Sequence, residues 1–322
     1  MIQAWYPASV STAESRLRYY AERFDTVEAD SPYYGIPAVS TTERWAQRTP
    51  VGFVFHVKAY GLMTGHTVDQ RSLAPELRGL EYRLSSRGRV YEPSRDMLDA
   101  TFEAFKCAVV PLREAGKLGG ILMQYPPTFR ATDGAELAAG LARIAADRER
   151  LASDTMLVEF RHASWVDDAR REKVLRFLAD EGITFVCVDS PSVPGAAVMP
   201  RTTAVTAHVA YVRFHGRNAA TWKLRSDSAS DRFDYLYTPD ELAEWADPLR
   251  DIASDADTTF AMFNNCRYDY APRNARELAT ILDDAALPET DGLSGGEGDE
   301  GVPPDRAGDA QGRQGILDFD DA

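Results

Sequence analysis

The feature that most constrains the fold of this chain is a regular alternation of short apolar segments with amphipathic ones. Seven segments rich in Val, Ile and Phe have the length of buried strands, and they lie near residues 26, 53, 121, 156, 184, 209 and 259. Segments with helical periodicity separate them, in the ranges 11–23, 41–48, 96–115, 134–148, 167–179, 239–253 and 272–285. Buried strands that alternate with amphipathic helices are typical of a parallel sheet covered by helices. We therefore expect an α/β fold of the TIM-type (β/α)8 barrel class.

One strand is missing from this pattern. A closed barrel of this class needs eight strands, and the eighth should precede the first helix, where only ten residues remain. We therefore expect the first strand to be absent from this chain and translation to begin upstream of Met1. An intact mass of the native protein that matches Met1 would contradict this expectation.

The 322 residues divide into a predicted barrel domain, 1–287, and a tail, 288–322. Barrels of roughly 200 to 250 residues fold as single domains. The barrel carries an insertion, 61–95, whose composition is rich in arginine: Arg71, Arg78, Arg83, Arg87, Arg89 and Arg95. The tail is rich in Gly, Asp and Glu and has almost nothing to bury, which predicts disorder.

The net charge of −14 is concentrated in that tail, where ten acidic residues face two arginines. An acidic surface repels nucleic acid and anionic membranes at long range, so a phosphate-bearing ligand would need a locally basic site. No apolar run approaches the ~18 residues of a membrane span, and the N-terminus does not resemble a secretory signal. The three cysteines have no metal-binding spacing, which favours reduced thiols. We expect a cytoplasmic protein without a membrane partner.

Polar side chains end every predicted strand. In a parallel barrel the carboxyl ends of the strands meet at one face, where barrel enzymes carry their chemistry. Seven convergent polar ends therefore predict a ligand site. The residues are Glu28, Asp30, Lys58, Gln124, Glu159, Arg161, Asp189, Arg213, His215, Asn264 and Asn265.

Several of these ends lie in motifs that resemble the YecE-like family, domain of unknown function 72 (DUF72). The matching segments are Val27-Glu28-Ala29-Asp30-Ser31-Pro32-Tyr33-Tyr34, Gln124-Tyr125-Pro126-Pro127, Val158-Glu159-Phe160-Arg161-His162, Tyr211-Val212-Arg213-Phe214-His215-Gly216-Arg217 and Phe263-Asn264-Asn265. Together they cover roughly Trp5 to Leu282, and their order is more specific than any one of them.

The chain departs from the family pattern in two ways. It lacks the opening Gly-x-Ser-Gly-Trp strand, and it has Asp30 where the family usually has Asn, with Gly35 where Arg is common. The resemblance implies a barrel similar to endonuclease IV and the xylose isomerases, without an established activity. Nucleic-acid binding is implied by that likeness of fold alone.

Glu28, Glu159, His215 and Asp189 are the candidate catalytic residues. The two glutamates could serve as general acid and base, or as ligands of a divalent metal, and His215 could transfer protons. Such a ligand set suits Mg or Mn better than Zn, and a site without metal is an equal alternative. The competing interpretation is structural: Glu159 pairs with Arg161, or Glu28 with Lys58, in a buried ion network.

The remaining candidates would bind substrate. Lys58, Arg161, Arg213 and Arg217 would hold phosphate, Tyr34 and Trp165 would stack on a ring, and His66 would close over the site. Asp30, Gln124, Asn264 and Asn265 would contact or orient the substrate. The alternative for Trp165 is a core aromatic, and for the Asn pair a role in fixing the loop.

A short apolar motif ends the tail. Gln314, Leu317 and Phe319 resemble a peptide that docks on DNA sliding clamps. The leading hypothesis is an enzyme acting on a phosphate-bearing substrate such as nucleic acid, as a phosphodiester hydrolase. The alternatives are a non-catalytic nucleic-acid-binding module recruited through the tail, and a sugar or small-metabolite enzyme of the isomerase type. Deletion from Glu289 onward would discriminate between them.

Overall fold

The computed structural model describes residues 5–191, 193, 198–220 and 233–282. Within them, seven parallel strands form one sheet in the order β1-β2-β6-β7-β8-β9-β10. All seven predicted strands are confirmed. Their bounds are β1 Thr26–Ala29, β2 Val54–Lys58, β6 Leu118–Gln124, β7 Met156–Glu159, β8 Thr184–Asp189, β9 Val209–Phe214 and β10 Thr258–Phe263.

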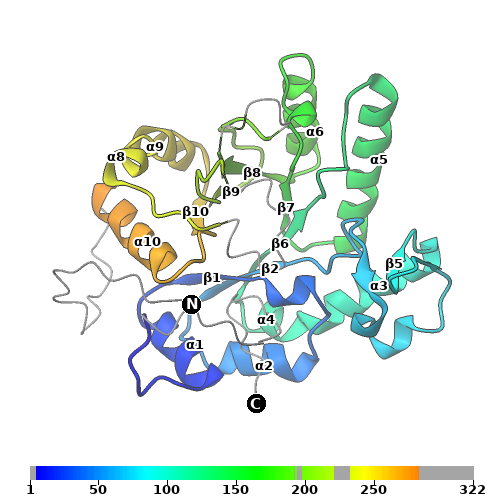
Figure 1. Cartoon of the computed structure of the whole chain (residues 1–322), viewed down its shortest axis with the longest axis horizontal. Helices are drawn as coiled ribbons and strands as arrows, with labels where there is room; N and C mark the ends of the chain where they lie inside the picture. The colour runs from blue at the N-terminus through cyan, green and yellow to red at the C-terminus, as the bar shows by residue number, and fades with distance from the viewer. Residues whose placement is uncertain (1–4, 192, 194–197, 221–232, 283–322) are drawn as a thin grey trace.

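The sheet curls into a nearly closed barrel with helices around it (Figure 1). Each strand pairs in parallel with the next one in the sheet. In the described part of the chain, β1 and β10 are the two ends of the sheet and have no pairing with each other. The predicted fold is thus confirmed: the described residues form a nearly closed seven-stranded parallel barrel, as expected of a TIM-type barrel without one of its strands.

The helices cover the outside of the sheet. Their bounds are α1 Ala13–Ala21, α2 Val39–Gln47, α3 Arg95–Ala108, α4 Val110–Glu114, α5 Gly134–Leu151, α6 Arg171–Asp180, α8 Pro239–Ala243, α9 Ala246–Asp255 and α10 Tyr270–Ile281. Side-chain caps set several of the starts, because hydroxyl and carboxylate oxygens accept from the first unpaired amides. Thr12 and Thr238 form capping boxes, and Ser94 and Asp133 also cap.

Two predicted helices are divided. The range 96–115 breaks at Val109, before Pro111, whose ring occupies the first turn of α4. The range 239–253 breaks between α8 and α9. None of the described helices is long and apolar enough to cross a bilayer.

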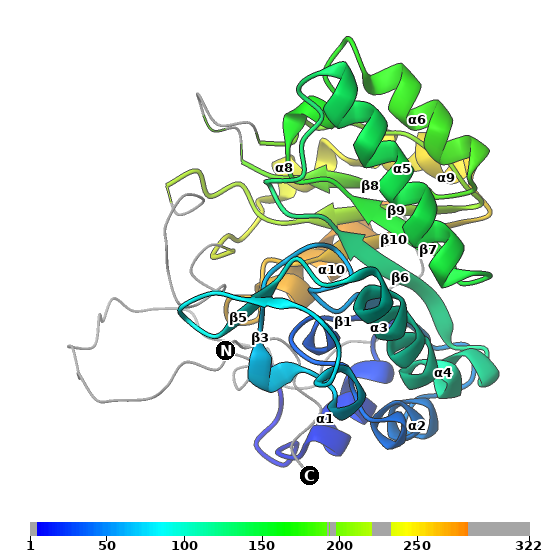
Figure 2. The same cartoon turned by 90° about the vertical axis from the view of Figure 1, so that its right-hand side faces the viewer.

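The insertion at 61–95 is more regular than its sequence indicates. It contains a three-stranded antiparallel sheet, in the order β3 (Val68–Asp69), β5 (Arg89–Tyr91), β4 (Arg83–Leu84), with 3-10 turns η3 (Gln70–Ser72) and η4 (Pro75–Leu77). The insertion lies beside α3 in two views at right angles (Figures 1 and 2). Leu77 and Val90 are fully buried and anchor it to the barrel domain.

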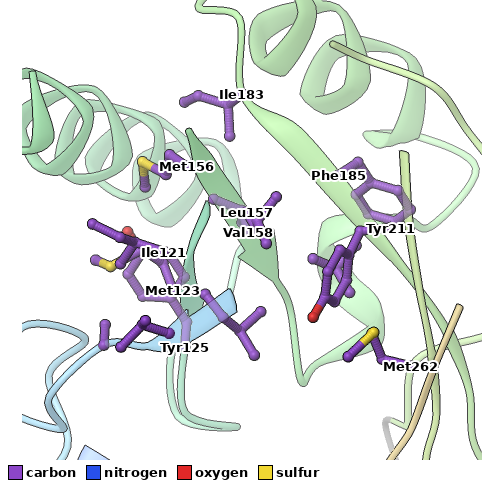
Figure 3. Packing of buried hydrophobic residues seen from close by; sticks show 14 of the residues in the cluster. Ile121, Met123, Tyr125, Met156, Leu157, Val158, Ile183, Phe185, Tyr211 and Met262 are labelled. Atoms are coloured by element: carbon purple, nitrogen blue, oxygen red, sulfur yellow. The ribbon is translucent and has the colours of Figure 1, made fainter. Parts of the chain in front are cut away.

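The core includes the middle of the sheet, where Ile121, Val158 and Phe185 come from neighbouring strands, with Val158 between the other two (Figure 3). Every residue of β8 and β9 is buried, which is characteristic of parallel strands covered on both faces. The last strand differs, because β10 is buried only at Met262. Val27 and Ala29 of β1, at the other end of the sheet, are buried.

Candidate functional site

A buried cluster joins three strands at the carboxyl end of the barrel. Arg213 of β9 is fully buried and forms ion pairs with Glu28 of β1 and Glu159 of β7. Its Nε donates to Oε2 of Glu28 at 3.0 Å, and the Tyr211 hydroxyl donates to the same oxygen at 2.9 Å. We call Glu28, Glu159, Arg213 and His215 the glutamate cluster.

Glu159 is the most heavily contacted member of this cluster. Its Oε1 accepts from Nε2 of Gln124 at 2.8 Å, lies 3.0 Å from Nε2 of His215, and is 3.5 Å from Arg161. Asn264 Nδ2 lies 3.1 Å from the other ring nitrogen of His215. If the Asn264 amide donates there, the neutral imidazole carries its proton on Nε2 and donates to Glu159.

The two glutamates differ in proton affinity. Burial raises the pKa of Glu28, although the Arg213 guanidinium opposes the rise. Burial acts the same way on Glu159, but the charges of Arg213, His215 and Arg161 outweigh it and hold its pKa well below the usual range. Burial lowers the pKa of His215 to about 4, so His215 is neutral at pH 7. At neutral pH, Glu159 is therefore an anion beside a neutral histidine.

Cationic side chains gather next to this cluster, where the insertion meets the barrel. Lys58 Nζ lies 4.9 Å from the centre of the Tyr33 ring, and the His66 ring lies 5.2 Å from it. Burial, together with the charges of Lys58 and Arg161, lowers the pKa of His66 to about 4. Burial raises the pKa of Tyr33, and the charges of Arg89 and Arg161 oppose that rise. We call Lys58, His66, Arg89 and Arg161 the rim cluster.

Sequence reasoning missed Arg89 and Tyr33. Arg89 is exposed on β5, and its Nε donates to the Thr67 hydroxyl at 3.3 Å. The arginine-rich composition of the insertion was a signal, but it could not show which arginine faces the barrel. Tyr33 stands beside the predicted Tyr34, which is 45% exposed.

The cations of the rim lie beside carboxylates. Lys58 is 3.4 Å from Asp30, Arg161 is 3.5 Å from Glu159, and Arg89 lies opposite Asp69 in the pairing of β3 with β5. The rim thus offers local positive charge within an acidic protein, which favours an anionic ligand.

Asp189 and Arg217 belong to a different arrangement, the Asp189 cluster. The Asp189 carboxylate accepts from the Tyr237 hydroxyl and the Trp245 indole, both at 2.7 Å, and from Arg217 Nη2 at 2.8 Å. Arg217 also donates to Glu244 at 3.0 Å. These contacts connect β8 to the segment around α8 and α9, and they occupy both predicted residues.

Two other predicted site residues are engaged within the core. Trp165, in the 3-10 turn η5 (Ala163–Trp165), is fully buried, stacks on Phe129 and Phe160, and donates to the Phe129 carbonyl at 2.8 Å. This geometry corrects the stacking role, because no ring face is accessible to a ligand. Asn265 is also fully buried and donates to the Tyr235 carbonyl and to Asn274, both at 2.9 Å, so it fixes the loop.

The donors do not suit a divalent metal. In the described part of the chain, no group of three or more His, Cys, Asp or Glu residues is arranged to hold an ion. Between the two glutamates, the cationic position belongs to the Arg213 guanidinium. The arrangement instead resembles an internally neutralised network beside a cationic rim.

The fold and this site define a class: parallel β/α barrels with a buried glutamate–arginine cluster at the mouth. A family model described as "Protein of unknown function DUF72" matches residues 1–292, and the chain belongs to this family. It is 28% identical over 282 residues to the UPF0759 protein YunF of Bacillus subtilis (strain 168), covering 86% of this chain and 90% of that protein.

Solved structures of the same family have the same fold. A DUF72 family protein from Enterococcus faecalis V583 superimposes with a TM-score of 0.67 at 27% identity, covering 85% of this chain and 96% of that one. A second, from Thermotoga maritima MSB8, gives a TM-score of 0.66 at 26% identity, covering 88% and 94%. The resemblance predicted from the strand-end motifs is thus confirmed.

Proposed function

We propose that this protein is an enzyme that acts on a phosphate-bearing substrate, as a phosphodiester hydrolase, at the mouth of the barrel. The observation that carries the proposal is the position of the rim cluster. Lys58 and His66 lie against the Tyr33 ring, and Arg161 lies 3.5 Å from Glu159, one of two carboxylates of unequal proton affinity. A cationic rim binds phosphate, and split carboxylate pKa values support acid–base chemistry.

The sequence predicted that Arg161, Arg213 and Arg217 all hold phosphate, and the proposal keeps only Arg161 in that role. Arg213 is held by close ion pairs with Glu28 and Glu159, and Arg217 by Asp189. Lys58 and Arg161 make longer contacts, 3.4 Å to Asp30 and 3.5 Å to Glu159, and the proposal assigns the phosphate to them.

Glu28, with its raised pKa, takes a proton from the attacking water as the new P–O bond forms and returns it to the leaving oxygen as the old P–O bond breaks. Glu159 stays ionised and orients His215. The chemistry is carboxylate-based, since Arg213 occupies the place of a metal.

The test separates binding from turnover. Phosphodiester and phosphomonoester hydrolysis is measured for the wild type, Glu28→Gln and Glu159→Gln, and inorganic phosphate binding is measured by calorimetry. We expect both variants to lose turnover while phosphate still binds, and Lys58→Gln to lose binding. Lys173→Gln, at an exposed site on α6, is the matched control. An unaffected rate in Glu28→Gln and Glu159→Gln would end the proposal.

A second candidate is a non-catalytic nucleic-acid-binding module. Tyr34 favours it, because an exposed ring beside a cationic rim can stack on a base. Recruitment would use Gln314, Leu317 and Phe319, which lie outside the described residues. Loss of clamp-dependent recruitment after deletion from Glu289, without any measurable turnover before it, would favour this candidate. Turnover of small sugars that survives the deletion would instead favour the isomerase-type enzyme.

Three unpaired cysteines, Cys107, Cys187 and Cys266, suit a reducing compartment. We therefore place the proposed activity in the cytoplasm.

A further inference from the structure

Asp30 carries a buried carboxylate that the described protein does not fully satisfy. Asp30 directly follows β1, and its side chain is 9% exposed. It stands at the N-cap position of the 3-10 turn η2 (Ser31–Tyr33), where a carboxylate ordinarily accepts from a backbone amide, yet it makes no such bond. Its Oδ1 is buried and has no hydrogen-bond partner among the described residues. Because a buried acceptor without a partner is destabilising, Oδ1 calls for a donor.

The charge of this carboxylate already has a partner. The Lys58 ammonium lies 3.4 Å from Oδ1, close enough for an ion pair but without the geometry of a hydrogen bond. Since Lys58 offsets the charge of Asp30, a second cation would gain little there. A carboxylate paired in this way accepts hydrogen bonds and donates none. The donor that Oδ1 requires is therefore a neutral group, such as a hydroxyl.

The space beside Asp30 has room for more than a water molecule. Glu28, Asp30 and Asn264 line one cavity, whose volume is about 180 Å³. One water needs only about 10–15 Å³ of such space. Asn264 Nδ2 also lies 3.1 Å from a ring nitrogen of His215, so the cavity adjoins the glutamate cluster. A ligand group bound at Asp30 would thus lie next to the carboxylates of the proposed reaction.

We propose that Asp30 accepts a hydrogen bond from a substrate hydroxyl that lies beside the phosphate. This role of Asp30 rests on the proposed function, which places the phosphate at Lys58. Because Asp30 Oδ1 and Lys58 Nζ are 3.4 Å apart, the hydroxyl and the phosphate belong to neighbouring parts of the substrate. The 2′-hydroxyl of a ribose is such a group, beside the 3′-phosphate. The substrate is then a ribonucleotide or another hydroxyl-bearing phosphate ester, and its deoxy analogue binds less tightly.

Two nucleotides that differ by one hydroxyl test this contact without requiring turnover. Adenosine 3′-phosphate and 2′-deoxyadenosine 3′-phosphate are titrated into the full chain by calorimetry, with inorganic phosphate as the reference for the rim cluster. We expect the adenosine form to bind about tenfold to 100-fold more tightly, because the deoxy form lacks one hydrogen bond to a charged acceptor. The comparison uses the wild type, so it does not depend on how a variant folds.

Variants at position 30 then assign the preference to this carboxylate. Asp30→Ala should abolish the preference, and because it removes the anion beside Lys58, it should strengthen the binding of inorganic phosphate. Asp30→Asn keeps a carbonyl acceptor and should retain part of the preference. Asp251→Ala, at an exposed position on α9, removes the same charge elsewhere and should change neither affinity.

A second pair of ligands identifies the source of the hydroxyl. Glycerol 1-phosphate and propyl phosphate differ in their hydroxyls and have no base. An Asp30-dependent preference in the adenosine pair alone indicates a nucleotide, and one in the glycerol pair indicates a sugar or polyol phosphate, and either result supports the contact. Equal affinities within both pairs, or a preference that survives Asp30→Ala, would overturn the role of Asp30 and leave the phosphate site standing. Absence of phosphate binding to the wild type would instead overturn the proposed function, and this role with it.

Discussion

The barrel carries two buried ionic clusters at the ends of its strands, and they differ in what their charges connect. In the Asp189 cluster one carboxylate accepts from Arg217, Tyr237 and Trp245, and the contacts join the sheet to α8 and α9. In the glutamate cluster one guanidinium serves two carboxylates from β1 and β7. Arg217 of the Asp189 cluster also pairs with Glu244, so its charge is neutralised within the cluster, whereas the glutamate cluster lies beside the cationic rim.

This difference shows that a charged residue at a strand end is not by itself a sign of chemistry. Buried charges need partners whether or not they act on a substrate. The pKa values of the two glutamates move in opposite directions, and His66 responds to the charges of Lys58 and Arg161. Residues that perturb one another next to a cationic rim are better candidates for function than a carboxylate surrounded by its own donors.

The largest expected effect is that of removing the guanidinium shared by the glutamates. Arg213→Met leaves Glu28 and Glu159 buried without their principal cation. Loss of one partner of a buried pair costs about 3–5 kcal/mol, and we expect a loss of that size in the free energy of unfolding measured with urea. The double variant Arg213→Met/Glu159→Gln should recover part of it, because one uncompensated charge is removed. Equal stability of the single and double variants would contradict the pairing.

A smaller effect is expected in the Asp189 cluster. Asp189→Asn keeps the size of the side chain but weakens three charge-assisted hydrogen bonds. We expect a loss of about 1.5–3 kcal/mol in the free energy of unfolding, with unchanged affinity for inorganic phosphate. Reduced phosphate affinity in a variant that remains folded would place Asp189 in the functional site after all.

The strands and the strand-end residues could be predicted because parallel strands have a strong apolar signature. The pattern near 121, 156, 184 and 209 corresponds to β6, β7, β8 and β9, which the structure buries almost completely. The division of the polar residues into two clusters could not be predicted. Arg213 and Arg217 are four residues apart, yet they bind different carboxylates, because Arg213 lies in β9 and Arg217 follows it in the loop.

The contribution of the insertion to the rim cluster could not be predicted from the sequence either. Six arginines between 61 and 95 look equivalent in composition, but the pairing of β5 with β3 places Arg89 opposite Asp69, and its charge opposes the rise in the pKa of Tyr33. For Trp165, the sequence instead suggested a functional role that the structure does not support. Its motif suggested a ligand contact, whereas Gly140 lets α5 approach the indole so closely that a Cβ would clash with it. Such a long-range contact between helix and turn leaves no local pattern.

Acid sensitivity should distinguish the clusters, because His215 belongs only to the glutamate cluster. Its pKa is about 4 in the folded protein and about 6.5 in an unfolded chain. Between these values the unfolded chain binds a proton that the folded protein refuses, so stability falls as the pH falls. From pH 7.5 to 5.5 this contributes a loss of about 1.4 kcal/mol. We expect His215→Gln to lose less stability than the wild type over this range in urea titrations, and equal losses would contradict the assignment.

The smallest effect on stability should accompany a large effect on ligand binding. Arg161 is 3.5 Å from Glu159, a longer contact than the Arg213 ion pair, so Arg161→Gln should lower the free energy of unfolding less than Arg213→Met. If Arg161 holds phosphate, the same change should weaken the binding of inorganic phosphate about tenfold, since one charge-assisted contact is lost. Arg171→Gln, at an exposed position on α6, controls for the loss of one positive charge. An unchanged phosphate affinity would assign Arg161 to the support of Glu159 and make the rim, like the Asp189 cluster, a structural feature.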